Sequence, residues 1–222
     1  MPPNQNKTQL MPTERTKLKR SYKRGDYKLQ TIYDILAAMP LCHVSYVLDR
    51  KPVVTPTLQW REGNHVYWHG SSASRLIRKS EGTDVCLAVS ILDGMVMARS
   101  AFHHSANYRS AMLFGKAVKI EDDVAKEASL KYMMDALFPG RWETLRPILK
   151  KELKATTVLT MPIDEASAKI RSGPPIDDED DYSLPIWAGV IPFTTNIEAI
   201  QNDPRNLDGM VAPENLKSFK IG

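Results

Sequence analysis

The chain has 222 residues, 42% hydrophobic and 25% charged, which fits one globular domain with extensions in a soluble protein. No run approaches about 18 apolar residues, and no apolar segment follows the N-terminal charges, so we expect neither a membrane span nor a signal peptide. Cys42 and Cys86 lie in apolar surroundings without a CxxC pair, so we expect a reducing, cytoplasmic location and no disulfide.

The net charge of +4 is concentrated at the N-terminus, where eight basic residues in 1–28 oppose Glu14 and Asp26. The eight are Lys7, Arg15, Lys17, Lys19, Arg20, Lys23, Arg24 and Lys28. Residues 1–25 are therefore predicted to form a flexible basic arm. The arm lacks the interleaved aromatic side chains of a single-strand-binding surface, and no helix-turn-helix or zinc-finger spacing follows it, so nucleic acid is not an expected partner.

The first predicted element is a helix over 27–39, which Asp26 can cap and Pro40 ends. The apolar period then falls to two, which predicts a meander of three strands, over 42–48, 52–60 and 65–69. Pro56 indicates an edge or a bulge in the second of these strands.

A short helix is predicted over about 73–80. The apolar run at 85–92 predicts a strand that is covered on both faces, and Asp93-Gly94 predicts a tight turn into a return strand over 95–101. Gly115, inside a strand predicted over 108–119, indicates a bulge or a close backbone approach.

The remaining predicted elements lead to an irregular C-terminal part. They are helices over 124–138 and 141–151, a strand over 155–163, an acidic run at 177–181 and a polar tail from about 195. Short strands joined by hairpins and interrupted by helices predict a mainly β fold, a small antiparallel barrel with helical additions.

The segment His69-Gly70-Ser71-Ser72-Ala73-Ser74-Arg75 is the most informative for function. A strand ends there and a helix begins, so free backbone N–H groups favour an anion. Hydroxyls of Ser72 and Ser74 add donors, and the guanidinium of Arg75 suits a phosphate. The alternative is ordinary N-capping by serine with Arg75 solvated.

The five histidines do not predict a metal site. His65 and His69 are four residues apart on a strand, which separates them by about 13 Å. His103 and His104 are adjacent, so their side chains diverge on a strand, and no carboxylate stands at ligand spacing. No nucleophile with an activating base is visible either.

Four segments together resemble the pyridoxamine 5′-phosphate oxidase-like, FMN-binding split-barrel family, including its bacterial flavin-nucleotide-binding subgroup, which is also similar to nitroimidazole-resistance proteins. They are CHVSYVLDRKPVVTPTLQWREGNHVYWHGSSASRLI, SILDGMVMARSAFHHSANYRSAMLFGKA, KELKATTVLTMPIDEASAKIRSGPP and LPIWAGVIPF. The resemblance covers about 26–193, which implies one FMN-binding, antiparallel split-barrel domain between the arm and a tail over 194–222.

The resemblance also implies a site. In the family, a serine and a basic residue hold the flavin phosphate, the second strand lines the ring with its backbone, and two residues of a later strand reach the partner's flavin in a homodimer. The matching positions here are Ser74 and Arg75 for the phosphate, Thr55, Pro56, Thr57 and Leu58 for the ring, His69 and Gly70 for small polar contacts, and Arg109 and Ser110 for the partner. Trp187 is expected to cover the ring or to seal the barrel.

The sequence departs from the vitamin-forming oxidases, because no arginine follows Trp187 in the segment Trp187-Ala188-Gly189-Val190-Ile191-Pro192. That departure argues against pyridoxamine-phosphate oxidation itself. His69 matches a histidine implicated in redox chemistry in the nitroimidazole-resistance proteins, and it is the candidate catalytic residue, although it can equally be a polar pocket residue.

The leading hypothesis is an FMN-dependent oxidoreductase that acts on a small-molecule substrate or electron donor. The first alternative is a non-catalytic module that stores or senses flavin. The second is a barrel that binds another flat ligand, deazaflavin or haem, with His69, His103 or His104 as candidate axial ligands.

Overall fold

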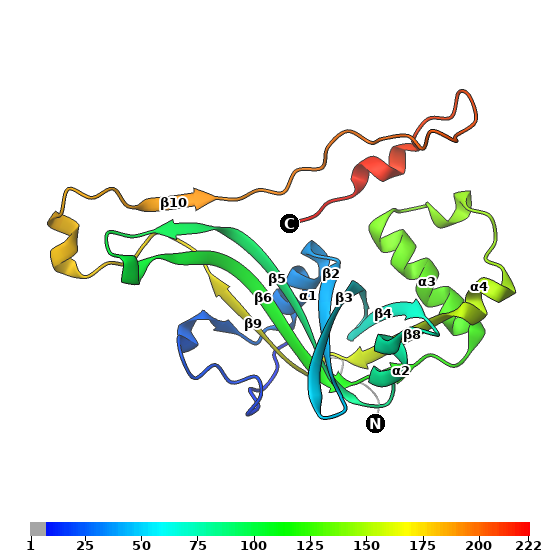
Figure 1. Cartoon of the computed structure of the whole chain (residues 1–222), viewed down its shortest axis with the longest axis horizontal. Coiled ribbons are helices and arrows are strands. Elements are labelled where there is room, and N and C mark those ends of the chain that lie inside the picture. Colours follow the sequence, from blue (N-terminus) through cyan, green and yellow to red (C-terminus); the bar gives the residue numbers. More distant parts are fainter. Residues whose placement is uncertain (1–7) are drawn as a thin grey trace.

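The computed structural model describes residues 8–222, and most of it is one curved antiparallel sheet (Figure 1). The strand order is β1-β9-β6-β5-β2-β3-β4-β8-β7, with β10 paired to the outer part of β5. The strands are β1 (Gly25–Asp26), β2 (Leu41–Leu48), β3 (Lys51–Glu62), β4 (His65–Ser71), β5 (Asp84–Met97), β6 (Ser105–Lys116), β7 (Val118–Lys119), β8 (Thr156–Pro162), β9 (Glu165–Arg171) and β10 (Gly189–Pro192).

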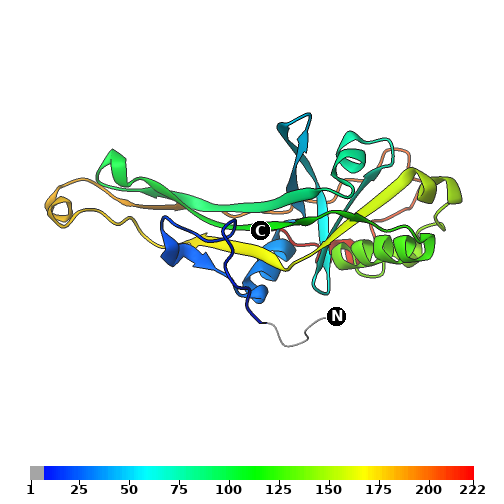
Figure 2. The ribbon, with the colours of Figure 1, turned by 90° about the horizontal axis from the view of Figure 1, so that it is seen from below.

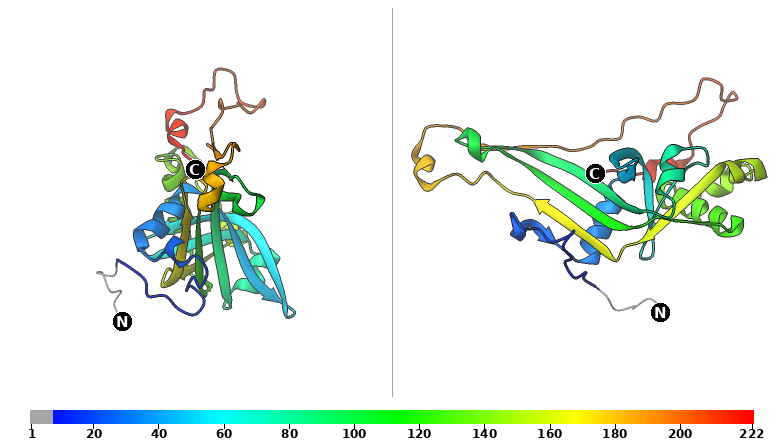
Figure 3. Two further views of the ribbon diagram at one scale, coloured as in Figure 1. Left: turned by 90° about the vertical axis from the view of Figure 1, so that its left-hand side faces the viewer. Right: turned by 60° about the horizontal axis from the view of Figure 1, so that its bottom comes forward.

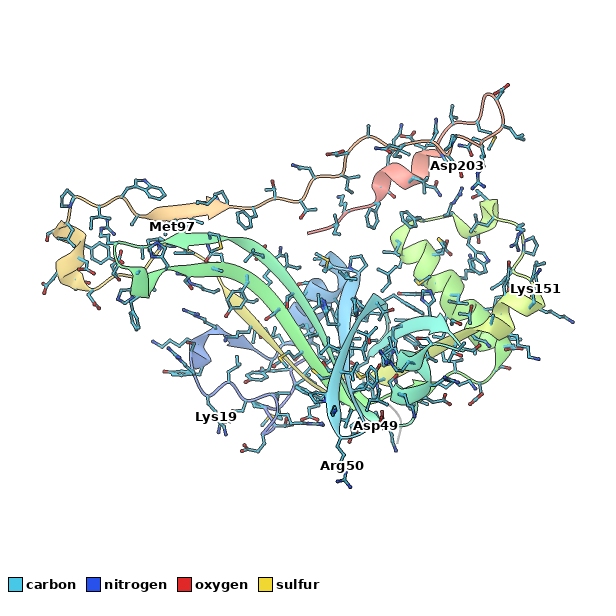
Figure 4. The ribbon with its side chains drawn as sticks, in the orientation of Figure 1. Lys19, Asp49, Arg50, Met97, Lys151 and Asp203 are labelled. Carbon is cyan, nitrogen blue, oxygen red and sulfur yellow. The ribbon has the colours of Figure 1, made fainter. Side chains whose placement is uncertain are left out.

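The sheet is split because β3 changes partners along its length. Residues 51–58 of β3 pair with β2, whereas residues 59–62 pair with β4. Asp49 and Arg50 form the turn between β2 and β3 in the left-handed backbone region that tight hairpins use, and both side chains point away from the barrel (Figure 4). The predicted three-strand meander and the mainly β, antiparallel split-barrel fold are therefore confirmed.

Two apolar cores hold the fold together. The main core fills the barrel beneath helix α1 (Leu29–Ala38), with Ile32, Trp68 and Leu87 fully buried. A smaller core of Trp60, Leu130, Leu153 and Val158 lies between the outer face of the sheet and two helices. These helices are α3 (Asp123–Leu137) and α4 (Lys150–Ala155).

The predicted tight turn at Asp93-Gly94 is wrong. β5 runs through both residues with only a register shift between Leu92 and Gly94, and the chain reverses beyond Met97, before β6 starts at Ser105. Figure 2 shows the resulting long β5–β6 hairpin, which extends well beyond the barrel. Both residues have other partners, since the Asp93 carboxylate binds Arg109 and Gly94 lies against Ile191 of β10.

The C-terminal part is more regular than predicted. β9 pairs with β6, and the acidic run begins at Asp177, which is buried and ion-paired to Arg99. Residues 193–211, called the strap below, are exposed throughout; they run along the molecule to about residue 203 and then turn (Figure 1). The chain then returns to the body, where Asn215 Nδ2 donates to Pro139 O at 2.8 Å and the last amide, of Gly222, donates to Ala38 O at 2.8 Å.

The helices differ from prediction mainly at their ends. α1 starts at Leu29, with Lys28 at its N-cap, although the Asp26 carboxylate accepts bonds from the Lys28 amide and the Thr31 hydroxyl. The helix predicted over 141–151 is instead a short turn followed by α4. Asp122 caps α3 by accepting from the Ala125 amide at 2.7 Å.

The described part of the basic N-terminal segment packs on the sheet. Leu10 is buried, and Arg15 binds the Glu165 carboxylate at the start of β9. Residues 1–7 of the predicted arm lie outside the described residues. Within residues 8–222, no helix combines the length and apolar character needed to cross a membrane.

Candidate functional site

The junction of β4 and helix α2 (Arg75–Ser80) presents donors without acceptors. Ser74 is the N-cap residue, but its hydroxyl makes no capping bond, so the first-turn amides of α2 lack a side-chain acceptor. The Ser72 amide is already used, since it donates to Ala155 O at 2.8 Å. Arg75 and Ser72 are exposed, and Ser74 is half-buried. This corner can therefore accept an anionic group at Ser74 and Arg75.

Gly70 positions the corner. A Cβ at Gly70 would lie 3.0 Å from Ile77 Cγ1, so the missing side chain lets α2 pack directly on β4. Ile77 is buried in the main core, which fixes the helix start against the sheet. The structure thus gives Gly70 a packing role, and its predicted contact with a cofactor stays a prediction.

The segment Thr55–Leu58 lies on an open strand edge. β3 pairs with β2 on one side there, and on the other side the β4 ladder begins only at Gln59. The Thr57 hydroxyl reaches across to His69 O at 3.4 Å, so this edge stands beside the end of β4. Backbone groups along an open edge need partners. A flat ligand with polar edges can supply them.

His69 lies next to this edge with its ring in the smaller core, tilted 55° against Trp60 at a centroid distance of 5.8 Å. Burial lowers the pKa of His69, which favours the neutral imidazole. Its Nδ1 is buried and has no hydrogen-bond partner among the described residues. An unpaired buried nitrogen is costly. This atom is therefore a natural contact for a bound group.

Arg109, Ser110 and Trp187 do not reach the corner within one chain. Arg109 forms a bidentate pair with Asp93, with Nη2 at 2.7 Å from Oδ1, and this bond raises the pKa of the guanidinium. The Ser110 hydroxyl donates to Lys169 O at 3.3 Å. β5 and β2 separate β6 from β3, so contacts of Arg109 or Ser110 with a flavin held on β3 require a second chain.

Trp187 lies far from α2, beside the outer part of the hairpin, where it packs on Gly189 at the start of β10 and is 70% exposed. It neither covers the open edge of β3 nor seals the barrel within one chain. The lack of a Cβ at Gly189 accommodates the indole, because a Cβ there would lie 2.8 Å from Trp187 Cζ2.

The two adjacent histidines sit at the far end of the β5–β6 hairpin. His104 Nδ1 lies 2.8 Å from Ser100 O, and because a carbonyl only accepts, Nδ1 donates this bond. His103 Nε2 instead lies 3.4 Å from the Asp178 carboxylate. Within residues 8–222, no three His, Cys, Asp or Glu side chains gather at metal-binding distances.

One face of the sheet, called the open face below, exposes apolar side chains from β2, β3, β5 and β6. Alternation along paired strands places them on the same side. They are Leu41, Val47, Val54, Leu58, Leu92 and Met112, each more than 40% exposed. Exposed apolar side chains gathered on one face of a sheet favour an interaction site.

A cavity of about 830 Å³ adjoins the β4–α2 corner between β8, α3 and α4. Ser72 belongs to both the corner and the cavity wall. The other lining residues are Lys119, Glu121, Asp123, Lys126, Glu127, Ile148, Lys150, Leu153, Lys154, Thr156 and Thr157, and we call the cavity the lysine pocket. Sequence reasoning missed it because its walls come from three segments that are distant in sequence.

These features define a split barrel with an open strand edge, a corner that presents uncapped amides beside Arg75, and a face that exposes apolar side chains. Residues 28–170 match the family model described as pyridoxamine 5′-phosphate oxidase. The chain therefore belongs to the pyridoxamine 5′-phosphate oxidase family, the split-barrel flavoproteins that its sequence resembles. Comparison with curated protein sequences finds no match.

Two solved structures resemble the chain well beyond the family domain. The flavocytochrome Anf3 from Azotobacter vinelandii is 48% identical, with a TM-score of 0.93 over 96% of this chain and 100% of that chain. The FAD and haem binding protein from Mycobacterium smegmatis is 36% identical, with a TM-score of 0.85 over 89% and 97%. A 5-nitroimidazole antibiotic resistance protein from Bacteroides thetaiotaomicron, 21% identical with a TM-score of 0.50 over 64% and 84%, shares the fold.

Proposed function

We propose that the chain is a redox flavoprotein that holds a flavin dinucleotide and a haem. The observation that carries this proposal is the match to the flavocytochrome Anf3, which extends over 96% of the chain and so includes parts outside the family model's 28–170. The second relative, at 36% identity, is described as binding FAD and haem. FMN was expected from the sequence, and both flavins share the ring and the first phosphate.

The residues of the corner fit a flavin. Ser74 and Arg75 would hold its first phosphate through uncapped amides, a hydroxyl and a guanidinium. The open edge of Thr55–Leu58 would bond the polar edge of the ring, and His69 Nδ1 would gain the partner that it lacks within the chain. When bound, a flavin supplies one- and two-electron transfer, and the protein orients it and excludes water.

His104 would hold a haem best among the three candidate histidines. Its Nδ1 bonds Ser100 O, so Nε2 would be the nitrogen that holds the iron, and metal-binding imidazoles usually donate their other N–H to a protein oxygen in this way. His103 faces Asp178, and His69 lies half-buried beside Trp60 at the edge already assigned to the flavin. Phe102 beside them is 86% exposed and offers an aromatic surface for a porphyrin.

A homodimer with flavin sites at its interface is part of the same proposal. The open face would meet the open face of a second copy, as a two-fold interface requires. The strap supports this arrangement, because it is exposed throughout and yet carries Phe193, Ile197, Ile200, Leu207 and Val211. In Figure 3 it stands apart from the body between its two attached ends. Ordering such a segment costs backbone entropy that contacts with a second copy would offset.

The test is an absorbance spectrum of the purified protein, followed by flavin titration of Arg75→Ala with Arg78→Ala as the matched control on the same helix. Flavin bands together with a Soret band are expected, and Arg75→Ala should weaken flavin binding about tenfold through loss of a charge-assisted bond, whereas Arg78→Ala should not. A colourless protein that takes up neither flavin nor haemin would refute the proposal.

The haem assignment has its own variants. His104→Ala should lose or shift the Soret band while the flavin bands persist, and His103→Ala should leave the Soret band unchanged. A Soret band that persists in His104→Ala and is lost in His103→Ala would contradict the assignment of His104. Reduction of the bound flavin by a chemical donor, followed by the haem spectrum, separates an electron-transferring protein from one that only stores flavin.

A further inference from the structure

We propose that the lysine pocket binds the adenylate half of the flavin dinucleotide. This inference rests on the proposed function, since it takes the first flavin phosphate to lie at Ser74 and Arg75. Ser72 is two residues before Ser74 and lines the pocket wall. A dinucleotide that leaves the corner past Ser72 therefore enters the pocket directly, whereas FMN would end at the corner.

The size of the pocket suits this occupant. Its volume of about 830 Å³ lies in the range of ligand sites, roughly 300–1,000 Å³, and exceeds what one small ion needs. Ile148 and Leu153 give the wall an apolar part on which an adenine can stack, and hydroxyls of Thr156 and Thr157 supply polar contacts. A nucleotide matches both parts of the wall, because it carries a flat apolar base and polar sugar and phosphate groups.

The charges of the pocket divide into paired and available groups. Lys126 is buried, and its Nζ donates to Leu153 O at 3.1 Å and binds Asp123 at 2.8 Å, so it builds the wall. Lys119 is paired with Glu121 at 2.8 Å.

Lys150 and Lys154, one turn apart on α4, have no carboxylate partner among the described residues. The remaining charge of the lining is the carboxylate of Glu127, so the lining carries one unpaired carboxylate against two unpaired lysines among the described residues. Lys150 and Lys154 are therefore the cations available to the second phosphate of a dinucleotide.

The corresponding experiment compares FAD and FMN binding by the apoprotein of Lys150→Gln/Lys154→Gln with that of Lys151→Gln. Lys151 lies on the same helix but outside the pocket lining, and its side chain points away from the body in Figure 4, so it is a matched control. The double variant should bind FAD at least tenfold more weakly, because two charge-assisted contacts are lost, with FMN affinity unchanged. Lys151→Gln should keep both affinities.

Several outcomes would overturn the inference. They are equal losses of FAD and FMN affinity in the double variant, unchanged FAD affinity, or wild-type protein that binds FMN as tightly as FAD. Wild-type protein that binds neither flavin would instead refute the proposed function itself, and this inference with it.

A second arm separates a dinucleotide site from a site for free nucleotides. AMP should compete with FAD but leave FMN binding unchanged. The affinity of FMN-loaded protein for AMP should fall in Lys150→Gln/Lys154→Gln and stay unchanged in Lys151→Gln. AMP that binds equally well to FAD-loaded protein would show that the pocket serves a separate nucleotide, and it would overturn the assignment.

Discussion

Gly70 illustrates how a single missing side chain sets the geometry of the corner. It lets α2 approach β4 so closely that Ile77 Cγ1 would lie 3.0 Å from any Cβ. The start of α2, with Ser74 and Arg75, is thereby held at the end of the strand whose face carries His69. The family resemblance points to Ser74 and Arg75 as candidate phosphate contacts, but only the structure explains why a glycine precedes them.

Gly70→Ala is therefore expected to destabilise the protein by about 1–3 kcal/mol, because the added methyl group overpacks a filled contact. Flavin affinity should fall as well, since the first turn of α2 must move. Thermal unfolding and flavin titration measure the two effects. In a double-mutant cycle with Ile77→Ala the costs should be less than additive, and strict additivity would show that the two side chains do not meet.

Cys42 is expected to be unreactive in the native protein. It is fully buried beneath the β2–β3 pair, and burial raises its pKa to about 12. The raised pKa keeps the thiol protonated, so the thiolate needed for reaction is scarce at every pH below that value. In a Cys86→Ser variant at pH 8, a thiol reagent should modify Cys42 only after denaturant is added. Rapid modification in native buffer would contradict this burial.

At the residue scale, the sequence predicted part of the candidate site. The strand end, serines and arginine at His69–Arg75 were recognisable because one continuous segment carries them. The pairing of Arg109 with Asp93 was not, since the Asp93-Gly94 dipeptide locally favours a turn. The lysine pocket could not be found, because its cations are ordinary surface lysines until α3 and α4 bring them together.

Strand β10 depends on close contact with β5 at the scale of elements. A Cβ at Gly94 would lie 2.6 Å from Ile191 O, closer than real contacts allow. The Asp93-Gly94 dipeptide, which locally favours a turn, is thus held extended by partners from β6 and β10. Tertiary contacts override the local preference here, which is why the hairpin was predicted too short.

Gly94→Ala should detach β10 from β5 while leaving the barrel folded. Amide hydrogen exchange of Met95 and Met97 is expected to accelerate, whereas that of Leu87 in the barrel should not change. Met97 lies beneath β10 in Figure 4. Met95→Ala on the same strand is the control, because its side chain is exposed. Unchanged exchange in Gly94→Ala would show that β10 accommodates the methyl group.

Attachment of the N-terminal segment should depend on pH. The hydrogen bonds from Arg15 are the main cause that lowers the pKa of Glu165, against an opposing effect of burial. A lowered folded-state pKa means that the stabilisation is complete above the ordinary glutamate pKa, about 4.3, and is lost as pH falls through the folded value. Protection of the Leu10 amide, which donates to Tyr27 O, should therefore drop below about pH 4.

Glu165→Gln provides the control for this pH dependence. It should show weak Leu10 protection at every pH, because the charged partner is gone, while Leu87 stays protected. A wild-type protein whose Leu10 protection is constant from pH 7 to about pH 3 would contradict a role for the Arg15–Glu165 pair.

The proposed dimer concerns the whole molecule, and the strap offers a way to test it. Ile197→Ser/Ile200→Ser removes two exposed apolar side chains without touching the barrel. Burial of each side chain against a second copy contributes about 1.5–3 kcal/mol, so the dimer should dissociate at least tenfold more readily. Sedimentation measures the change, with Gln201→Ser as the control on the same segment. A monomeric wild type would contradict the dimer.

The whole-molecule arrangement could be predicted only in part. The barrel follows from local alternation and turns, and the family resemblance extends to about residue 193. The strap looked like a polar tail, because its apolar residues are spaced without helical or strand periodicity. Only the structure indicates an interface role for these apolar residues, because it shows that both ends of the segment are attached to the body.

Attachment at both ends has a kinetic consequence for the proposed dimer. A subunit enclosed beneath a closed span cannot leave by moving straight outward, so either β10 or the C-terminal contacts of Asn215 and Gly222 must open first. The rate of subunit exchange would then follow this local opening and not the strength of the interface. Subunit exchange between differently tagged dimers should be slow in wild type and faster in Gly94→Ala, even if the two proteins have the same dimer dissociation constant.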